Sequence, residues 1–209
     1  MDERAEVSEC MRVVRAHASG VLRCDETPEP VKFVLSRADH SVVLPVERGL
    51  LEAEVFLLCL PDDSFDLRVR LLLRMRELER DYEVDRDRHL AYHGETTGLA
   101  WVRGVIDHAH TAGGIVVDGG LLMRESSLRA GEARLCRLLN ADRDRLRDAT
   151  ELLGGVRVEE PLAVGVDAHG FDVRAYHGIV RVEFPSVCHD EQTATRVIRT
   201  LLDGGADGG

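Results

Sequence analysis

The sequence predicts an α+β protein, in which a β-rich first part of about 125 residues is followed by a small unit of helix, β-hairpin and helix. Two observations carry this prediction. Residues 66–77 alternate between apolar side chains and polar ones, mostly arginine, with the period of a β-strand. From residue 138 onward, a helical period, two strand-like runs and a second helical period follow one another in that order.

The chain begins with a short helix, because apolar residues between Val7 and Val14 recur at helical spacing. Apolar runs then mark four short strands, at residues 20–24, 31–37, 41–46 and 55–60. A helical excursion is expected at 48–53. After the strand at 66–77, residues 84–93 have a helical pattern, and a strand at 99–106 resumes at 114–118. We assign these elements to one domain over residues 1–125.

The second unit opens with an amphipathic run over residues 138–155, which Gly154 and Gly155 end, as glycine does at a helix C-terminus. The apolar residues at helical spacing are Leu135, Leu138, Leu139, Leu146, Ala149 and Leu152. These residues predict that one face of the helix is buried.

Two strands and a helix complete this unit. The turn at 167–170 has the residues of a tight β-connection within 162–176. In residues 180–184 apolar and charged side chains alternate, so we expect a buried face and a wet face that carries Arg181. With the helix at 190–202, the domain spans 132–203, and the glycine-rich tail 204–209 is expected to be disordered.

Three segments of the second unit carry a resemblance to a known family: Leu-Asn-Ala-Asp at 139–142, the hairpin sequence at 165–175, and Val-Glu-Phe-Pro at 182–185. Their order and spacing resemble the small C-terminal domain of HugZ-type haem-utilisation proteins. The family's usual Asn-Ala-Asp-His run ends here in Arg143, so any role of that imidazole is absent.

The element order of residues 1–125 is similar to the flavin-binding split barrel of the pyridoxamine 5'-phosphate oxidase-like group, which precedes the small domain in HugZ-type proteins. The resemblance therefore implies a split β-barrel, FMN-binding-like, followed by a small C-terminal α+β domain. It also implies a homodimer formed mainly through the barrel. Residues 55–60 are apolar on both faces, and such a strand needs cover on both sides, from its own domain or from a partner.

Composition excludes several classes of function. The net charge of −11 argues against nucleic-acid binding, which needs a basic face. No apolar run reaches the 18 residues of a membrane span, and the acidic, polar start is unlike a secretory signal. The five cysteines are odd in number and form no CxxC pair, which indicates reduced thiols in a cytoplasmic protein.

The resemblance implies that a flavin phosphate would bind near the third strand and the turn after it, where Arg48 is the candidate donor. Arg37 and Arg70 are the candidates from neighbouring strands. Glu47 and Glu52 flank Arg48 and would repel an anion, and the hydroxyl and amide donors that hold such a group are missing beside it. The alternative is that these arginines solvate the barrel and pair with carboxylates. We expect no stoichiometric FMN in the purified protein.

Haem, the other ligand that the resemblance implies, needs an axial ligand and apolar walls. Of the nine histidines, His177, beside Tyr176 in the C-terminal hairpin, is the first candidate for that ligand.

Two histidine pairs have a spacing that could serve metal ligands. His108 and His110 would share a face of an extended segment, but no further ligand lies near them in sequence, so no metal is expected. His89 and His93 lie four apart on the predicted helix, where the charged residues around them indicate a solvated face.

Three functions remain open. The first is a HugZ-like oxidoreductase, haem-degrading or FMN-dependent, with an eroded cofactor site. The second is a non-catalytic dimeric scaffold that binds a partner protein, like the glutamyl-tRNA-reductase-binding relatives of this architecture. The third is a small-ligand sensor. No GxSxG, P-loop or GxGxxG spacing supports a hydrolase, nucleotidase or dinucleotide reading.

Overall fold

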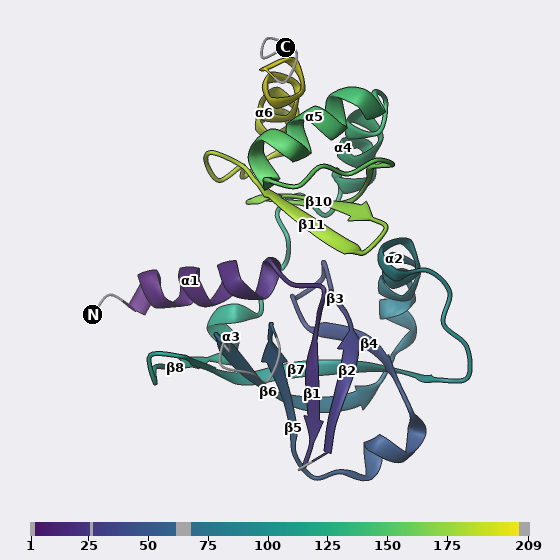
Figure 1. Cartoon of the computed structure of the whole chain (residues 1–209). Coiled ribbons are helices and arrows are strands. Elements are labelled where there is room, and N and C mark those ends of the chain that lie inside the picture. Colours follow the sequence, from purple (N-terminus) through teal and green to yellow (C-terminus); the bar gives the residue numbers. More distant parts are fainter. Residues whose placement is uncertain (1–2, 26, 62–67, 205–209) are drawn as a thin grey trace. The chain divides into compact units, whose positions relative to one another are not determined.

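The computed structural model describes residues 3–25, 27–61 and 68–204, in which the chain forms two units, Met1–Glu125 and Ser126–Gly209 (Figure 1). Both units are mixed α+β, and every strand pair described in them is antiparallel. None of the helices in the described ranges is long and apolar enough to cross a membrane.

A curled antiparallel sheet forms the first unit, with the strand order β2-β1-β5-β6-β7-β4-β3 and with β8 paired to β7 (Figure 1). Its strands are β1 Ser19–Cys24, β2 Thr27–Lys32, β3 Val34–Leu35, β4 Val42–Val46, β5 Phe56–Leu60, β6 Val69–Glu77, β7 Ala100–Thr111 and β8 Val116–Asp118. The concave side holds the core, to which Leu22, Leu44, Leu58 and Leu71 each contribute a fully buried side chain.

Helical segments of the first unit are α1 Glu3–Arg15, η1 Arg48–Glu52, η2 Arg80–Tyr82, α2 Glu83–His93 and α3 Gly119–Leu122. The apolar spacing of α1 is confirmed, since Cys10 and Val14 are fully buried in the core. Helix α2 ends at Gly94, whose φ of 81° suits glycine.

The alternation along β6 is confirmed from Val69 onward: Val69, Leu71 and Leu73 face the core, while Arg70 and Arg74 face outward. Residues 66 and 67 of the predicted strand lie outside the described residues.

The predicted strand at 31–37 is wrong in its extent. The chain changes partner at Phe33, since β2 pairs with β1 and β3 pairs with β4. The buried Phe33 ring separates the two strands. The sequence does not predict the first half of β2, because Pro28 and Pro30 are residues that usually interrupt a strand. An edge strand tolerates proline, and β2 is an edge strand.

Strand β7 is longer than predicted and runs without a break to Thr111. Its register against β6 shifts between Leu72 and Leu73, which face His108 and Ile106. The residue between these two partners, Asp107, therefore forms a β-bulge.

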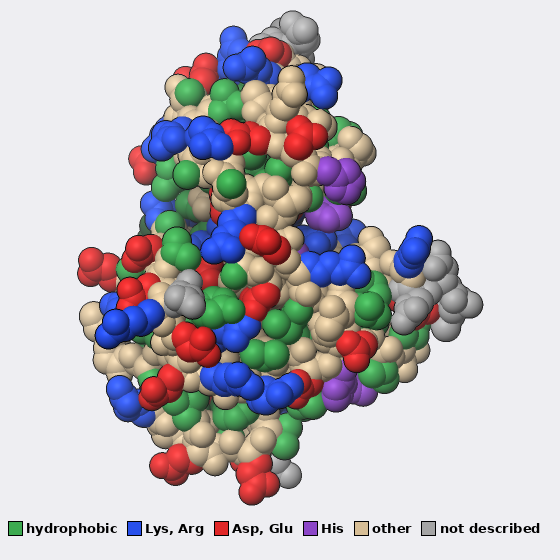
Figure 2. Space-filling model, turned by 180° about the vertical axis from the view of Figure 1, so that it is seen from behind, with side chains coloured by type: hydrophobic (Ala, Val, Ile, Leu, Met, Phe, Trp, Pro, Cys, Tyr) green, Lys and Arg blue, Asp and Glu red, His purple; other side chains and the backbone are tan. Residues whose placement is uncertain are grey.

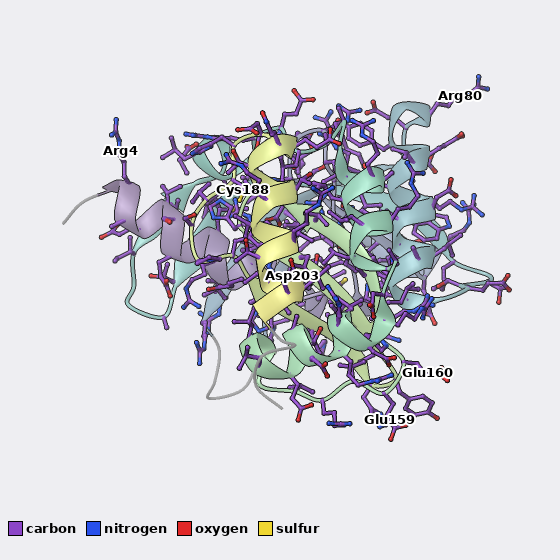
Figure 3. The ribbon with its side chains drawn as sticks, turned by 90° about the horizontal axis from the view of Figure 1, so that it is seen from above. Arg4, Arg80, Glu159, Glu160, Cys188 and Asp203 are labelled. Atoms are coloured by element: carbon purple, nitrogen blue, oxygen red, sulfur yellow. The ribbon has the colours of Figure 1, made fainter. Side chains whose placement is uncertain are left out.

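The second unit places three helices on one face of a three-stranded sheet of order β11-β10-β9 (Figure 1). Its elements are α4 Glu132–Leu139, α5 Arg143–Gly154, β9 Leu162–Asp167, β10 Gly170–Ala175, β11 Gly178–Glu183 and α6 Glu191–Gly204. Phe171, Val182 and Ile198 are fully buried between the two layers. Asp203 lies near the end of α6, where Figure 3 labels it. It accepts a hydrogen bond of 2.6 Å from Arg145 Nη1 on α5.

The predicted helix at 138–155 is two helices, because polar side chains interrupt it. Asp142 Oδ1 accepts from the backbone N–H of Arg145 at 3.1 Å and caps α5. Asn140 exchanges two hydrogen bonds of 2.9 Å with the backbone of Ala163. Gly155 ends α5 at φ 69°, as predicted, but Leu152 is 68% exposed and does not belong to the buried face. In the expected tail, Gly204 is the last residue of α6, and residues 205–209 lie outside the described part of the chain.

The expectation that Arg181 lies on a wet face is wrong. Its side chain is 7% exposed, and its guanidinium donates to Asp167 at 2.6 Å and to Asp172 at 3.1 Å. Burial alone lowers the pKa of an arginine, but the charges of Asp172 and Asp167 outweigh it and raise the pKa of Arg181. Two carboxylates on neighbouring strands thus make burial of this cation possible.

Candidate functional site

The convex side of the first sheet is covered unequally. Helix α2 packs against β3 and β4, where Val43 is fully buried. Over β1, β5, β6 and the second half of β7, the outward side chains remain partly or wholly exposed, except for the buried Cys59. We call these side chains the open sheet face: Val21, Arg23, Leu57, Cys59, Arg70, Leu72, Arg74, Val105, Asp107, His108 and His110.

Strand register arranges the open sheet face in rows. One row runs across the strands from Arg23 through Leu57 and Leu72 to His108. The next row runs from Val21 through Cys59 and Arg70 to His110. Because directly opposed residues on one face lie about 5 Å apart, the two leucines form an apolar centre between basic and imidazole side chains. The rings of His108 and His110 are inclined to each other by 65°, with their centroids 5.0 Å apart.

An ion pair and a hollow lie at the other end of the open sheet face. Arg74 donates to both carboxylate oxygens of Asp107, and this hydrogen bonding raises the pKa of Arg74. A hollow of about 550 Å³ is lined by these two side chains, by Leu72, and by Val55 and Phe56 at the start of β5.

Of the four predicted site residues, only Arg70 lies on the open sheet face. Arg48 is exposed on η1, and Arg37 is buried after β3, so the two flank opposite ends of β4, a strand whose five residues span about 16 Å. His177 is exposed at the turn between β10 and β11 of the second unit, with its ring 4.7 Å from that of Tyr176. The structure therefore does not bring Arg37, Arg48 and Arg70 together as a phosphate cradle.

Arg37 belongs to a buried polar network. Burial raises the pKa of Asp85 on α2, although hydrogen bonds from the Ser36 side chain and the Arg37 backbone oppose that rise. The charges of Arg88 and Arg37 act in the same sense as these hydrogen bonds. The network fixes the loop after β3 to α2.

A second network holds the same loop against β7. Asp39 accepts from the backbone N–H and Oγ of Ser41, from Tyr82 Oη at 3.1 Å, and from Arg103. Burial raises the pKa of Asp39, but the hydrogen bonds from Ser41 and Arg103 outweigh burial and lower it. The Arg103 guanidinium also lies 4.3 Å from the centroid of the Tyr82 ring. Donors from the loop, from η2 and from β7 thus converge on the Asp39 carboxylate.

The prediction of a solvated face at His89 and His93 is wrong. His89 is 1% exposed, and its Nε2 donates to Lys32 O at 3.1 Å; His93 Nε2 donates to Phe33 O at 3.0 Å. Since a carbonyl only accepts, both rings carry their proton on Nε2. Burial lowers both pKa values, that of His93 to about 4. These histidines fix α2 to the segment that joins β2 to β3, so their role is structural.

Sequence reasoning considered His108 and His110 only as a metal pair. The described residues contain no group of three or more histidines, cysteines or acidic residues that could hold a metal ion. Strand β7 continues past residue 106 beside β6, which local sequence does not indicate, and this places both histidines in the rows of Leu72 and Arg70. On the face shown in Figure 2, the described cationic and anionic side chains are interspersed, with hydrophobic groups between them.

Comparisons with known proteins identify a shared fold. No protein-family model and no curated protein matches the sequence. Among solved structures, a protein of unknown function from Agrobacterium tumefaciens is similar, with a TM-score of 0.72 and 15% identity over 93% of this chain and 96% of that chain. A heme binding protein from Mycobacterium smegmatis has a TM-score of 0.45 and 18% identity over 97% of this chain and 98% of that chain. The first likeness shows that this chain shares its fold with the Agrobacterium protein over nearly its whole length.

Proposed function

We propose that this chain is a split-barrel protein of the haem-utilisation type that binds a tetrapyrrole over its open sheet face as a homodimer. One observation carries the proposal: that face has an apolar centre bordered by arginines and by two adjacent histidines. No described residue is assigned a catalytic role.

The chemistry of these side chains fits a haem better than a flavin phosphate. A haem presents apolar faces, an iron that takes an imidazole ligand, and two carboxylates that pair with guanidinium groups. Leu57 and Leu72 would contact the ring, His108 or His110 would supply the imidazole, and Arg70 would pair with a carboxylate. The haem itself would supply the redox chemistry.

The region where the resemblance implies a flavin phosphate supports such a ligand less well. Such a group needs several donors converging on one point. Arg48 stands exposed between the exposed Glu47 and Glu52, and Arg37 is buried beside Asp85 at the opposite end of β4. The expectation that the purified protein carries no stoichiometric FMN therefore stays part of the proposal.

A haemin titration tests the ligand. The wild-type chain should show a saturable shift of the Soret band. The double variant His108→Ala/His110→Ala should bind at least about tenfold more weakly, a loss of about 1.4 kcal/mol. Arg70→Ala should weaken binding by a smaller factor.

Three matched variants serve as controls. Arg48→Ala removes an exposed arginine away from the face, and His177→Ala and His189→Ala remove exposed histidines of the second unit. All three should bind as the wild type does. If the Soret shift is absent, or if it survives in the double variant, haem does not bind at this site. If His177→Ala abolishes the shift, the axial ligand lies in the hairpin of the second unit instead.

The proposed dimer is tested separately by light scattering at micromolar concentration. Leu57→Glu places a charge at the centre of the open sheet face and should convert the dimer to a monomer with an unchanged circular dichroism spectrum. Leu152→Glu, at a side chain 68% exposed on α5, should leave the dimer intact. A monomeric wild-type chain would contradict the proposed assembly.

A further inference from the structure

The two edges of the sheet in the second unit differ in how their backbone groups are satisfied. In the order β11-β10-β9, the edge strands are β9 and β11. Along β9, Glu132 Oε1 accepts from the backbone N–H of Val166 at 3.1 Å. The side-chain amide of Asn140, the C-cap of α4, bonds both backbone groups of Ala163. Polar side chains of α4 and its cap therefore close the β9 edge.

The β11 edge is open. The two-residue turn between β10 and β11 makes Ala175 and Gly178 a hydrogen-bonded pair, and such pairs alternate along an antiparallel ladder. The N–H and C=O groups of Ile179, Arg181 and Glu183 therefore point away from β10. Within the described part of the chain, these backbone groups have no hydrogen-bond partner. A row of such groups is a template for a further strand.

On the face of β11 that points toward the helices, an added strand would meet apolar groups. Val182 is fully buried in the core of the second unit, and Val180 packs against that core. Helix α5 ends over this part of β11, since a Cβ at Gly154 would lie 3.0 Å from Val180. Leu153 and Val156, close to Gly154 in sequence, remain exposed. Alternate apolar side chains of an added strand would lie beside the two valines.

The opposite face of β11 changes in charge along the strand. Glu183 is exposed at one end and forms no ion pair with a described residue. Arg181, in the middle, is already held by two carboxylates. Ile179, at the other end, is the register partner of Arg174 on β10. An added strand is therefore favoured with a cation opposite Glu183 and an apolar, uncharged side chain opposite Ile179.

We propose that the β11 edge binds an extended segment of a partner protein as an added antiparallel strand, with a basic side chain opposite Glu183 and an apolar one opposite Ile179. Backbone hydrogen bonds supply the affinity, and the side-chain pairs set the register and direction. A second copy of β11 fits less well, because its one cation, Arg181, is already neutralised. This surface belongs to the second unit alone and is independent of the open sheet face.

Amide hydrogen exchange of the full chain, followed by NMR, tests whether the edge is open. The amides of Ile179, Arg181 and Glu183 should exchange at least about tenfold faster than those of Val180 and Val182, which donate to β10. Slow exchange of the three amides at every protein concentration would show that the chain itself covers the edge. Slow exchange that develops only as the concentration rises would show that a second copy occupies it. Either result overturns the proposal.

A peptide tests the occupant. In acetyl-Lys-Val-Thr-Val-Leu-amide, the lysine, threonine and leucine would lie opposite Glu183, Arg181 and Ile179 in turn. The peptide should bind with a Kd below about 1 mM and slow the exchange of these three amides. Two N-methylated isomers share its charge. Methylation of the threonine and leucine nitrogens, which face β11, should weaken binding at least about tenfold, whereas methylation of the two valine nitrogens, which face away, should not.

Charge reversal tests the register. Glu183→Lys should weaken the lysine peptide about two- to fivefold and strengthen a peptide with glutamate in place of lysine, as expected for an exposed ion pair. Glu160→Lys makes the same change of charge at an exposed loop position and should bind both peptides as the wild type does. The proposal is overturned if the lysine peptide does not bind at about 5 mM, if the two N-methylated isomers bind equally, or if both variants have the same effect.

Discussion

Protonation of His93 should destabilise the first unit as the pH falls below neutrality. In the folded chain its Nε2 donates to Phe33 O, and burial lowers its pKa from the ordinary value of 6.5 to about 4, with smaller contributions from the charges of His89 and Lys32. Because the folded-state pKa is the lower one, the contribution to stability is complete above pH 6.5. It is lost progressively as the pH falls toward 4, since the unfolded chain takes up the proton first.

The magnitude follows from the two pKa values. Each unit of difference is worth about 1.36 kcal/mol, and the full difference between 6.5 and about 4 sets the upper limit. Relative to pH 7, the free energy of unfolding should decrease by at most about 2 kcal/mol at pH 5 and about 3 kcal/mol at pH 4. His89, whose pKa burial also lowers, adds to the effect in the same direction.

The assay compares the wild-type chain with His93→Gln, whose side-chain amide keeps a donor near Phe33 O but does not titrate. Trp101 is the only tryptophan, and its ring centroid lies 5.0 Å from that of His89, so its fluorescence reports on unfolding of the first unit. Urea denaturation at pH 7 and pH 5 should show that the wild-type advantage over His93→Gln shrinks by about 1–2 kcal/mol. An advantage that is equal at both pH values would refute the reasoning, because carboxylates that titrate in both proteins cancel in this comparison.

Three further perturbations have defined outcomes. Arg181→Met should lower the free energy of unfolding by about 3–5 kcal/mol, measured by urea denaturation, because it leaves two buried carboxylates facing each other; a loss below about 1 kcal/mol would contradict this. Gly119→Ala should prevent folding of the first unit, judged by circular dichroism, because a Cβ there would overlap Ile106 O, whereas Gly49→Ala, with open space around it, should fold normally. Asp142→Ala should cost about 1 kcal/mol in thermal denaturation by removing the cap of α5, and no change would show that the cap is replaced.

Local periodicity predicted much of the fold. The helix at α1 and the alternation of β6 follow from spacing alone, because one buried face imposes a period on the sequence. Periodicity failed where a polar group is buried by partners far along the chain. Arg181 is paired with Asp167, 14 residues away in sequence, and no local pattern distinguishes it from a solvated arginine.

The candidate site was much harder to predict than the fold. Arg70 and His110 are register partners on β6 and β7, but 40 residues separate them in the sequence. A row of side chains across several strands depends on strand order and register, and one residue of slippage would move each side chain to the opposite face. The bulge at Asp107, which sets the register of both histidines, has no marker such as glycine in the sequence.

The two prolines of β2 also bear on how copies of this chain can meet. Pro28 and Pro30 occupy a six-residue strand at one end of the sheet, and proline has no N–H to offer a further strand. This edge is therefore a poor template for sheet extension, and it protects the protein from the edge-to-edge aggregation to which exposed strands are prone. At the β2 edge, copies of this chain could therefore meet only through side-chain contacts, which can be mutated one residue at a time.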